Sequence, residues 1–200
     1  MDEMVRQAMA RWPNVPHCYG WLALDARGAF RMRDEAAQAS HAAGDVIRHP
    51  TLLSFIYRNY LPDERGCWYF QNGPQRVYVE LETTPYIART DPVHGFVTHD
   101  GEPLNNLEQA WMTEEGRLVL RAGEKLAMVD DRDLGACLSL LRMDGGLVED
   151  MVLMDWLADP KGTLQLASGG QLMPVQPLKS SALQQLGFVP HPSPMPDHGA

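Results

Sequence analysis

Residues 68–82 read Trp68-Tyr-Phe-Gln-Asn-Gly-Pro-Gln-Arg-Val-Tyr-Val-Glu-Leu-Glu82, with two aromatic or β-branched runs on either side of an Asn-Gly-Pro turn. Asn and Gly accept the positive φ that a tight reversal of the chain needs. After the turn, apolar and polar residues alternate, as they do on a strand with one buried face. The segment therefore predicts a β-hairpin.

Similar patterns recur along the chain. Alternating runs bounded by glycine predict hairpins at 19–33 and 163–175 and a meander of short strands over 96–129. Apolar residues at helical spacing, with capping residues before them, predict helices over 1–11, 51–60, about 131–142 and 182–186. Residues 147–157 fit a helix or a strand, and we expect a strand over 152–156.

This order of elements predicts an α+β protein of two small β-rich units, each built of antiparallel hairpins and covered by helices. The pattern restarts near residues 90–95, so we place the division there. The expected parts are an N-terminal helix or arm (1–16), an α+β domain (17–92), a β-rich domain with helices (93–189) and a disordered proline-rich tail (190–200).

Composition and charge exclude several classes of protein. The chain has 200 residues, 44% of them hydrophobic, and a formal charge of -9. That charge opposes binding to nucleic acid and to anionic membranes. Cys18, Cys67 and Cys137 form no disulfide or zinc pattern, and we find no export signal or membrane-spanning segment. We therefore expect a cytoplasmic protein with reduced thiols.

Four stretches carry a family resemblance, and they are 20–28, 47–55, 68–79 and 111–120. In them the chain resembles a group of uncharacterised proteobacterial proteins known only as domains of unknown function. The resemblance implies an α+β roll, here over 17–92, paired with a small β-roll domain, together covering most of residues 17–190. It implies no catalytic residue.

One polar set invites a binding role. Gln71, Asn72, Gln75, Arg76 and Tyr78 concentrate planar hydrogen-bonding groups in a single hairpin, so they could recognise an anionic or amide-bearing ligand. The alternative is structural. The glutamines and the asparagine would then serve the turn, and Arg76 would pair across strands with an acid near residues 80–82.

His94, His99 and Asp100 are the main candidates for metal-assisted chemistry. Their spacing matches neither the helical HExxH pattern nor a Cys/His zinc pattern, so we expect no metal site. Asp130, Asp131 and Asp133 could bind a divalent ion, but a role in capping the following helix is simpler.

Neither a nucleophile nor a nucleotide site is evident. Cys18 beside His17 is the least implausible reactive pair, but neighbouring residues on a strand point apart. The chain has no Gly-x-Ser-x-Gly elbow and no glycine-rich phosphate loop, so we expect no cofactor.

These observations favour a non-enzymatic binding or regulatory module, with an unknown small molecule or protein held between the two units. The alternative is a metal-assisted hydrolase or isomerase that uses His94, His99 and Asp100. A third possibility is a homodimer formed through an exposed edge strand.

Overall fold

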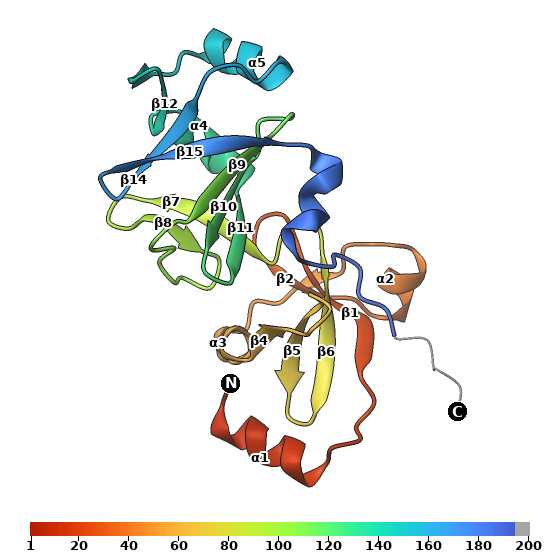
Figure 1. Ribbon diagram of the computed structural model, residues 1–200. Helices are drawn as coiled ribbons and strands as arrows, with labels where there is room; N and C mark the ends of the chain where they lie inside the picture. The colour runs from red at the N-terminus through yellow and green to blue at the C-terminus, as the bar shows by residue number, and fades with distance from the viewer. Residues whose placement is uncertain (195–200) are drawn as a thin grey trace. The chain divides into compact units, whose positions relative to one another are not determined.

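The computed structural model of this protein describes residues 1–194 (Figure 1). The chain forms two compact units, Met1–Thr83 with the C-terminal segment from Gly187, and Thr84–Leu186. Each unit combines helices with a β-sheet, which confirms the α+β class. The units divide before the strand at 86–91 because that strand pairs only with strands of the second unit. The expected tail falls partly outside the described residues, since 195–200 are not among them.

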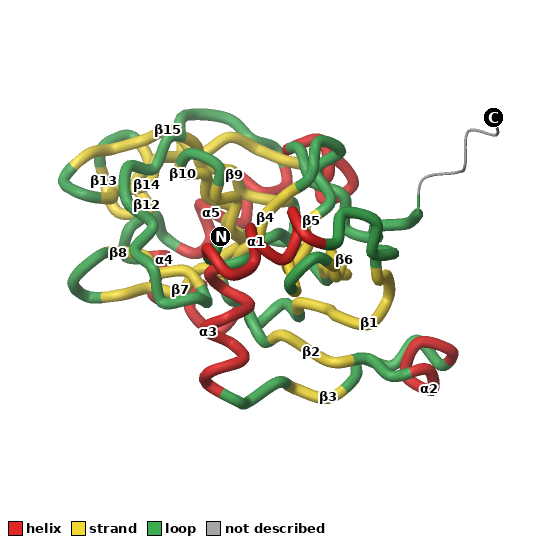
Figure 2. Tube along the Cα trace, turned by 90° about the horizontal axis from the view of Figure 1, so that it is seen from below, coloured by secondary structure: helices red, strands yellow, loops and turns green. Residues whose placement is uncertain are grey.

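The first unit contains a six-stranded mixed sheet in the order β3-β2-β1-β6-β5-β4. Figure 2 shows β1, β2 and β3 side by side in this order. The elements are α1 (Glu3–Arg11), β1 (Cys18–Leu24), β2 (Phe30–Met32), α2 (Glu35–Ala39), β3 (Asp45–Val46), α3 (Pro50–Arg58), β4 (Tyr60–Pro62), β5 (Trp68–Asn72) and β6 (Gln75–Leu81).

The predicted hairpin at 68–82 is present as β5 and β6. Phe70 lies opposite Val77, and Tyr69 lies opposite Tyr78. Gly73 in the turn has a φ of 56°, the left-handed conformation that glycine adopts without strain. The predicted hairpin at 19–33 is also present, as β1 and β2. Strand β1 also pairs with β6, but in parallel, which hairpin patterns alone could not reveal.

Helix α3 covers one face of this sheet. Its Phe55 ring meets the Phe70 ring edge-on, with centroids 5.4 Å apart. Phe30 is fully buried on the same side, and the centroid of its ring lies 5.5 Å from that of the Tyr60 ring. The helix begins one residue before the predicted start, because Pro50 occupies its first turn and the His49 side chain caps it.

The second unit contains a nine-stranded sheet in the order β13-β12-β14-β15-β9-β10-β11-β7-β8. The predicted meander is confirmed as antiparallel β9, β10 and β11, although β7 and β15 join it in parallel. The strands are β7 (Tyr86–Asp91), β8 (Gly95–Thr98), β9 (Gln109–Thr113), β10 (Leu118–Ala122), β11 (Lys125–Val129), β12 (Leu141–Met143), β13 (Gly146–Leu147), β14 (Leu164–Ser168) and β15 (Gln171–Leu178).

The helices of the second unit differ from the sequence expectation in two places. They are the 3₁₀ helix η1 (Asp131–Asp133), α4 (Leu134–Leu138), α5 (Asp150–Ala158) and the 3₁₀ helix η2 (Ser180–Leu186). The helix expected to reach about residue 142 stops at 138, because β12 then pairs with β14. The strand expected over 152–156 is wrong, since those residues belong to α5.

We predict that Phe30→Ala lowers the free energy of unfolding of the first unit by about 3–5 kcal/mol, because it empties a fully enclosed aromatic site. Urea denaturation followed by intrinsic fluorescence measures this. Met32→Ala on the same strand is the control. Its side chain is 47% exposed, so about 0.5 kcal/mol or less is expected. Equal losses in both variants would contradict the packing described here.

Candidate functional site

Three tyrosines lie side by side on the sheet face of the first unit opposite α3. They come from adjacent strands: Tyr19 from β1, Tyr78 from β6 and Tyr69 from β5. The Tyr19 and Tyr78 rings stack with centroids 4.5 Å apart and planes 4° from parallel. The Tyr69 ring is 5.7 Å from that of Tyr78. Residues of β6 alternate between faces, so Val77 and Val79 lie on the α3 side.

A pocket of about 440 Å³ opens beside this row, and we call it the tyrosine pocket. Its walls combine aromatic rings, two guanidinium groups, two carboxylates and one imidazole. The residues that line it are His17, Tyr19, Pro62, Asp63, Glu64, Arg65, Tyr69, Arg76 and Tyr78. All of them belong to the first unit.

Asp63 organises one wall of the pocket. Its carboxylate accepts hydrogen bonds from the backbone N–H groups of Arg65 and Cys67, both at 2.9 Å. It also accepts from Arg65 Nε and from the Tyr78 hydroxyl, both at 3.0 Å. Partial burial by itself raises the pKa of Asp63. The hydrogen bonds together have the larger effect, so the pKa of Asp63 is lowered overall. Asp63 therefore stays charged and fixes the positions of Arg65 and Tyr78.

Arg76 differs from Arg65 in having no acidic partner. Its guanidinium carbon lies 4.6 Å from the centre of the Tyr69 ring, and its side chain is half-buried. Within residues 1–194, Arg76 forms no ion pair with a carboxylate. The alternative that paired it with an acid near residues 80–82 is wrong, because Glu80 contacts His191 and Glu82 accepts from the Ala26 backbone.

The charged residues that line the tyrosine pocket shift the pKa of His17. Partial burial lowers the pKa of His17, and the positive charges of Arg76 and Arg65 lower it further. Asp63 acts in the opposite direction but with less effect. The two arginines therefore dominate the electrostatic environment at His17, and the imidazole is neutral at pH 7.

The C-terminal segment crosses the same face of the sheet. The Val189 side chain packs on the cluster formed by Cys67, Tyr69 and Tyr78. Its backbone N–H donates to the Gly66 carbonyl at 2.9 Å. The Ser193 carbonyl accepts from Arg65 Nη1 at 3.2 Å. Residues of the expected tail are thus tied to the rim of the tyrosine pocket.

The structure brings together two of the five polar residues singled out in the sequence. Arg76 and Tyr78 both line the tyrosine pocket. Gln71 is fully buried, and its side-chain amide donates to the Gly73 carbonyl. Asn72 is exposed, and Gln75 donates to the Pro16 carbonyl. Gln71 thus holds the turn, and Gln75 ties β6 to the segment before β1.

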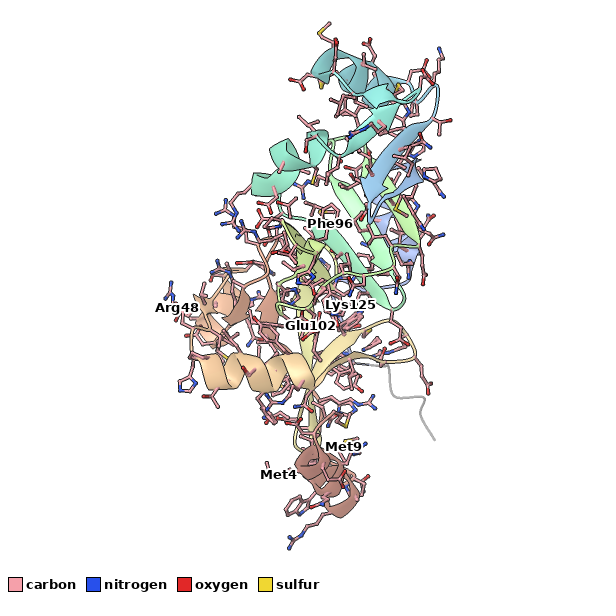
Figure 3. All side chains as sticks on the ribbon, turned by 90° about the vertical axis from the view of Figure 1, so that its left-hand side faces the viewer. Met4, Met9, Arg48, Phe96, Glu102 and Lys125 are labelled. Atoms are coloured by element: carbon pink, nitrogen blue, oxygen red, sulfur yellow. The ribbon has the colours of Figure 1, made fainter. Side chains whose placement is uncertain are left out.

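The other candidates lie in the second unit and are held by ordinary structural contacts. The His94 backbone N–H donates to the Asp91 carboxylate at 2.8 Å. His99 accepts from the Ile87 N–H, and Asp100 accepts from the Thr98 hydroxyl and pairs with Lys125. In the same loop, the Glu102 carbonyl accepts a hydrogen bond from the Thr98 N–H at 2.9 Å. Glu102 and Lys125 are labelled in Figure 3. In the described part of the chain, no three His, Cys, Asp or Glu side chains are close enough to hold a metal ion.

The acidic residues before α4 are structural, as the capping interpretation predicts. The Asp130 side chain accepts from the Arg132 N–H at the start of η1 and pairs with the Arg132 guanidinium. Asp133 accepts from the Thr90 N–H at 2.7 Å and from Arg89. These contacts tie η1 to β7.

The thiols lack the environment of an activated nucleophile. Burial raises the pKa of Cys18 and of Cys67, and it raises the pKa of Cys137 to about 12. Cys67 and Cys137 are both buried among apolar side chains, as the sequence suggests.

Sequence reasoning missed Tyr19, Asp63, Arg65 and Tyr69 as pocket residues. Asp63 and Arg65 lie in a segment that reads only as a turn, although Asp-x-Arg before glycine permits the hydrogen bonds seen here. Tyr19 reaches the pocket through the parallel pairing of β1 with β6, for which the sequence carries no local signal.

A family model matches residues 1–193; the family is DUF2944, described as "Protein of unknown function (DUF2946)". The chain belongs to this family. The expected membership in a family of uncharacterised proteins is thereby confirmed. No curated protein matches the chain.

One solved structure has a similar fold, a crystal structure of a DUF1285 family protein from Silicibacter pomeroyi DSS-3. The TM-score is 0.51 at 16% sequence identity, over 88% of this chain and 96% of that chain. At this identity the likeness concerns the fold alone. In the described residues, no helix is both long and apolar enough to span a membrane.

We predict that Asp63→Asn lowers the free energy of unfolding by about 1–3 kcal/mol at pH 7, because it disturbs four hydrogen bonds at a carboxylate that is largely buried. The pKa of Asp63 is lowered on folding, so its contribution is complete above about pH 4 and is lost as the pH falls further. Urea denaturation at pH 7 and pH 3 measures both effects.

Glu64→Gln is the control for this prediction, since Glu64 is an exposed neighbour in the same loop. Its effect is expected to be about 0.5 kcal/mol or less. A penalty for Asp63→Asn that is the same at pH 3 as at pH 7 would contradict the role of the charged carboxylate.

We also predict that Arg76→Gln raises the pKa of His17, because it removes one of the two cations that oppose the imidazolium form. Burial is the largest cause of the lowering and remains, so the pKa of His17 stays below its ordinary value. An NMR pH titration of the His17 ring protons measures the change. Arg48→Gln removes an exposed arginine elsewhere on the unit and should leave the value unchanged. An unchanged or lower pKa in Arg76→Gln would contradict the electrostatics described here.

Proposed function

We propose that this protein is a cytoplasmic, non-enzymatic binding module whose tyrosine pocket holds a small organic anion, a carboxylate or a phosphate ester attached to a planar apolar group. Arg76 would bind the anionic group, and the tyrosine rings would contact the rest of the ligand. The pocket lies within the first unit, so the proposal needs no residue from 84–186.

The observation that carries the proposal is that Arg76 forms no ion pair with a carboxylate in residues 1–194. A half-buried guanidinium on an aromatic ring is oriented, and it can offer paired N–H donors to a carboxylate or phosphate. Burial opposes its charge, but a hydrogen bond with Tyr78 and nearby groups raise the pKa of Arg76, so it remains cationic.

Size and overall charge narrow the ligand class. A volume of about 440 Å³ is in the range of small-molecule sites, which is about 300–1,000 Å³. The chain as a whole carries -9, which opposes polyanions such as nucleic acid. A small ligand with one anionic group needs a favourable potential only next to Arg76. The net negative charge of the chain therefore opposes it less than it opposes a polyanion.

The residues at the pocket support binding in preference to covalent chemistry. They include no serine, threonine, cysteine or lysine. Asp63 accepts four hydrogen bonds and has a lowered pKa, so it is a weak base. The phenol of Tyr78 already donates to Asp63, and burial raises its pKa.

The test uses four probes of similar size, phenyl phosphate, benzoate, benzamide and benzylamine, titrated into the full chain and followed by NMR. We expect the two anions to shift the ring signals of the pocket tyrosines and to raise the pKa of His17. The neutral amide and the amine should bind at least tenfold more weakly. Loss of a charge-assisted hydrogen bond costs about 1.5–3 kcal/mol, so Arg76→Gln should weaken the anions about 10-fold to 100-fold.

Arg48→Gln removes the same charge from an exposed site before α3, labelled in Figure 3, and is the matched control. Arg76→Lys keeps the charge but loses the paired donors, so its affinity should fall between those of the wild type and Arg76→Gln. The proposal fails if benzamide binds as tightly as benzoate, or if Arg76→Gln and Arg48→Gln have equal effects.

A further inference from the structure

Helix α5 in the second unit presents an exposed apolar face. Met151 and Met154 are 75% and 65% exposed, whereas Trp156 is buried. Leu153 and Leu157, on the side of Trp156, are half-buried. The helix therefore packs through the side of Trp156 and leaves both methionines, and to a lesser extent Val152, in solvent.

Helix geometry places acids along both edges of this exposed face. Successive residues are rotated by about 100°, so Met151, Met154 and Ala158 fall within about 60° of one another. Asp150 lies beyond one edge of that arc and Asp155 beyond the other. We call this set, Met151, Met154 and Ala158 between Asp150 and Asp155, the methionine face.

The charges in the chain segment that contains the methionine face have one sign. From 144 to 159 every charged residue is acidic, and the chain there contains no lysine, arginine or histidine. Those residues are Asp144, Glu149, Asp150, Asp155 and Asp159. The next base, Lys161, is paired with Asp159. An apolar patch flanked by Asp150 and Asp155, which form no ion pair in the described residues, complements a partner with the opposite charge pattern.

From this we propose that the methionine face docks a cationic amphipathic helix of another protein, with apolar side chains on the methionines and lysines or arginines on the flanking acids. Methionine side chains are flexible and polarizable, so they adapt to different apolar surfaces. An amphipathic helix laid on such a surface is a recurrent mode of peptide recognition.

Two other occupants are less suitable on electrostatic grounds. A second copy of this chain would bring the same acids against themselves across a two-fold axis, because such an interface pairs one patch with itself. An anionic membrane surface would be repelled by the same carboxylates. Only a basic partner gains from both the methionines and the acids.

The probe is a synthetic 18-residue peptide of leucine and lysine with all leucines on one helical face, titrated into the full chain. Binding is followed through the methionine ε-methyl NMR signals. We expect Met151 and Met154 to shift. Met4 should not, although it is 77% exposed on α1 (Figure 3), because its acidic neighbours Asp2 and Glu3 are paired with arginines.

Variants separate the apolar and ionic contributions. Replacing Met151 and Met154 with glutamine should weaken the peptide at least tenfold, whereas Met4→Gln should have no effect. Replacing Asp150 and Asp155 with asparagine should weaken it at least threefold and reduce its salt dependence. A peptide with glutamate in place of lysine should not bind.

Three results would overturn the proposal. One is equal shifts at Met4 and at the two α5 methionines. Another is equal affinity for the lysine and glutamate peptides. The third is unchanged affinity in both double variants, each of which alters only exposed side chains and can be checked for folding by circular dichroism.

Discussion

The alternation of side chains along β6 is the constraint on which both the core and the pocket of the first unit depend. Val79 and Leu81 enter the core beneath α3, and Arg76 and Tyr78 face the tyrosine pocket. A slip of one residue in its pairing would exchange the two sets, burying a guanidinium and exposing valine. The register of Tyr69 opposite Tyr78 therefore fixes the core and the pocket together.

Contacts from three distant parts of the chain hold this register. Parallel pairing of β1 brings Tyr19 onto the Tyr78 ring. The Asp63 loop binds the Tyr78 hydroxyl. The C-terminal segment accepts a hydrogen bond from the Leu81 N–H through the Pro190 carbonyl. The contacts of Tyr19 and of Pro190 join residues that are far apart in the sequence, so the pocket can form only after these distant segments have assembled.

This explains which features the sequence could predict. The β5–β6 hairpin was predictable because its signals, an Asn-Gly turn and a period of two, lie within fifteen residues. Grouping Gln71 with Arg76 by nearness in sequence did not identify the pocket, because Gln71 binds its own turn instead. Tyr19 and Asp63 required the parallel pairing and the loop geometry. Helix α5 was missed because a continuous apolar run fits a helix or a strand equally well.

The carboxylates closest to Arg76 in the first unit are held by other partners. Moving Asp63 toward Arg76 would break four hydrogen bonds, and moving Glu80 would break its contact with His191. Glu64 at the pocket rim is exposed, and hydrated carboxylates gain little from pairing. Among residues 1–194, Arg76 thus forms no ion pair with a carboxylate, because Asp63 and Glu80 bind other partners and Glu64 is exposed. For that reason we place the proposed anionic ligand at Arg76 and not at Arg65, which is paired with Asp63.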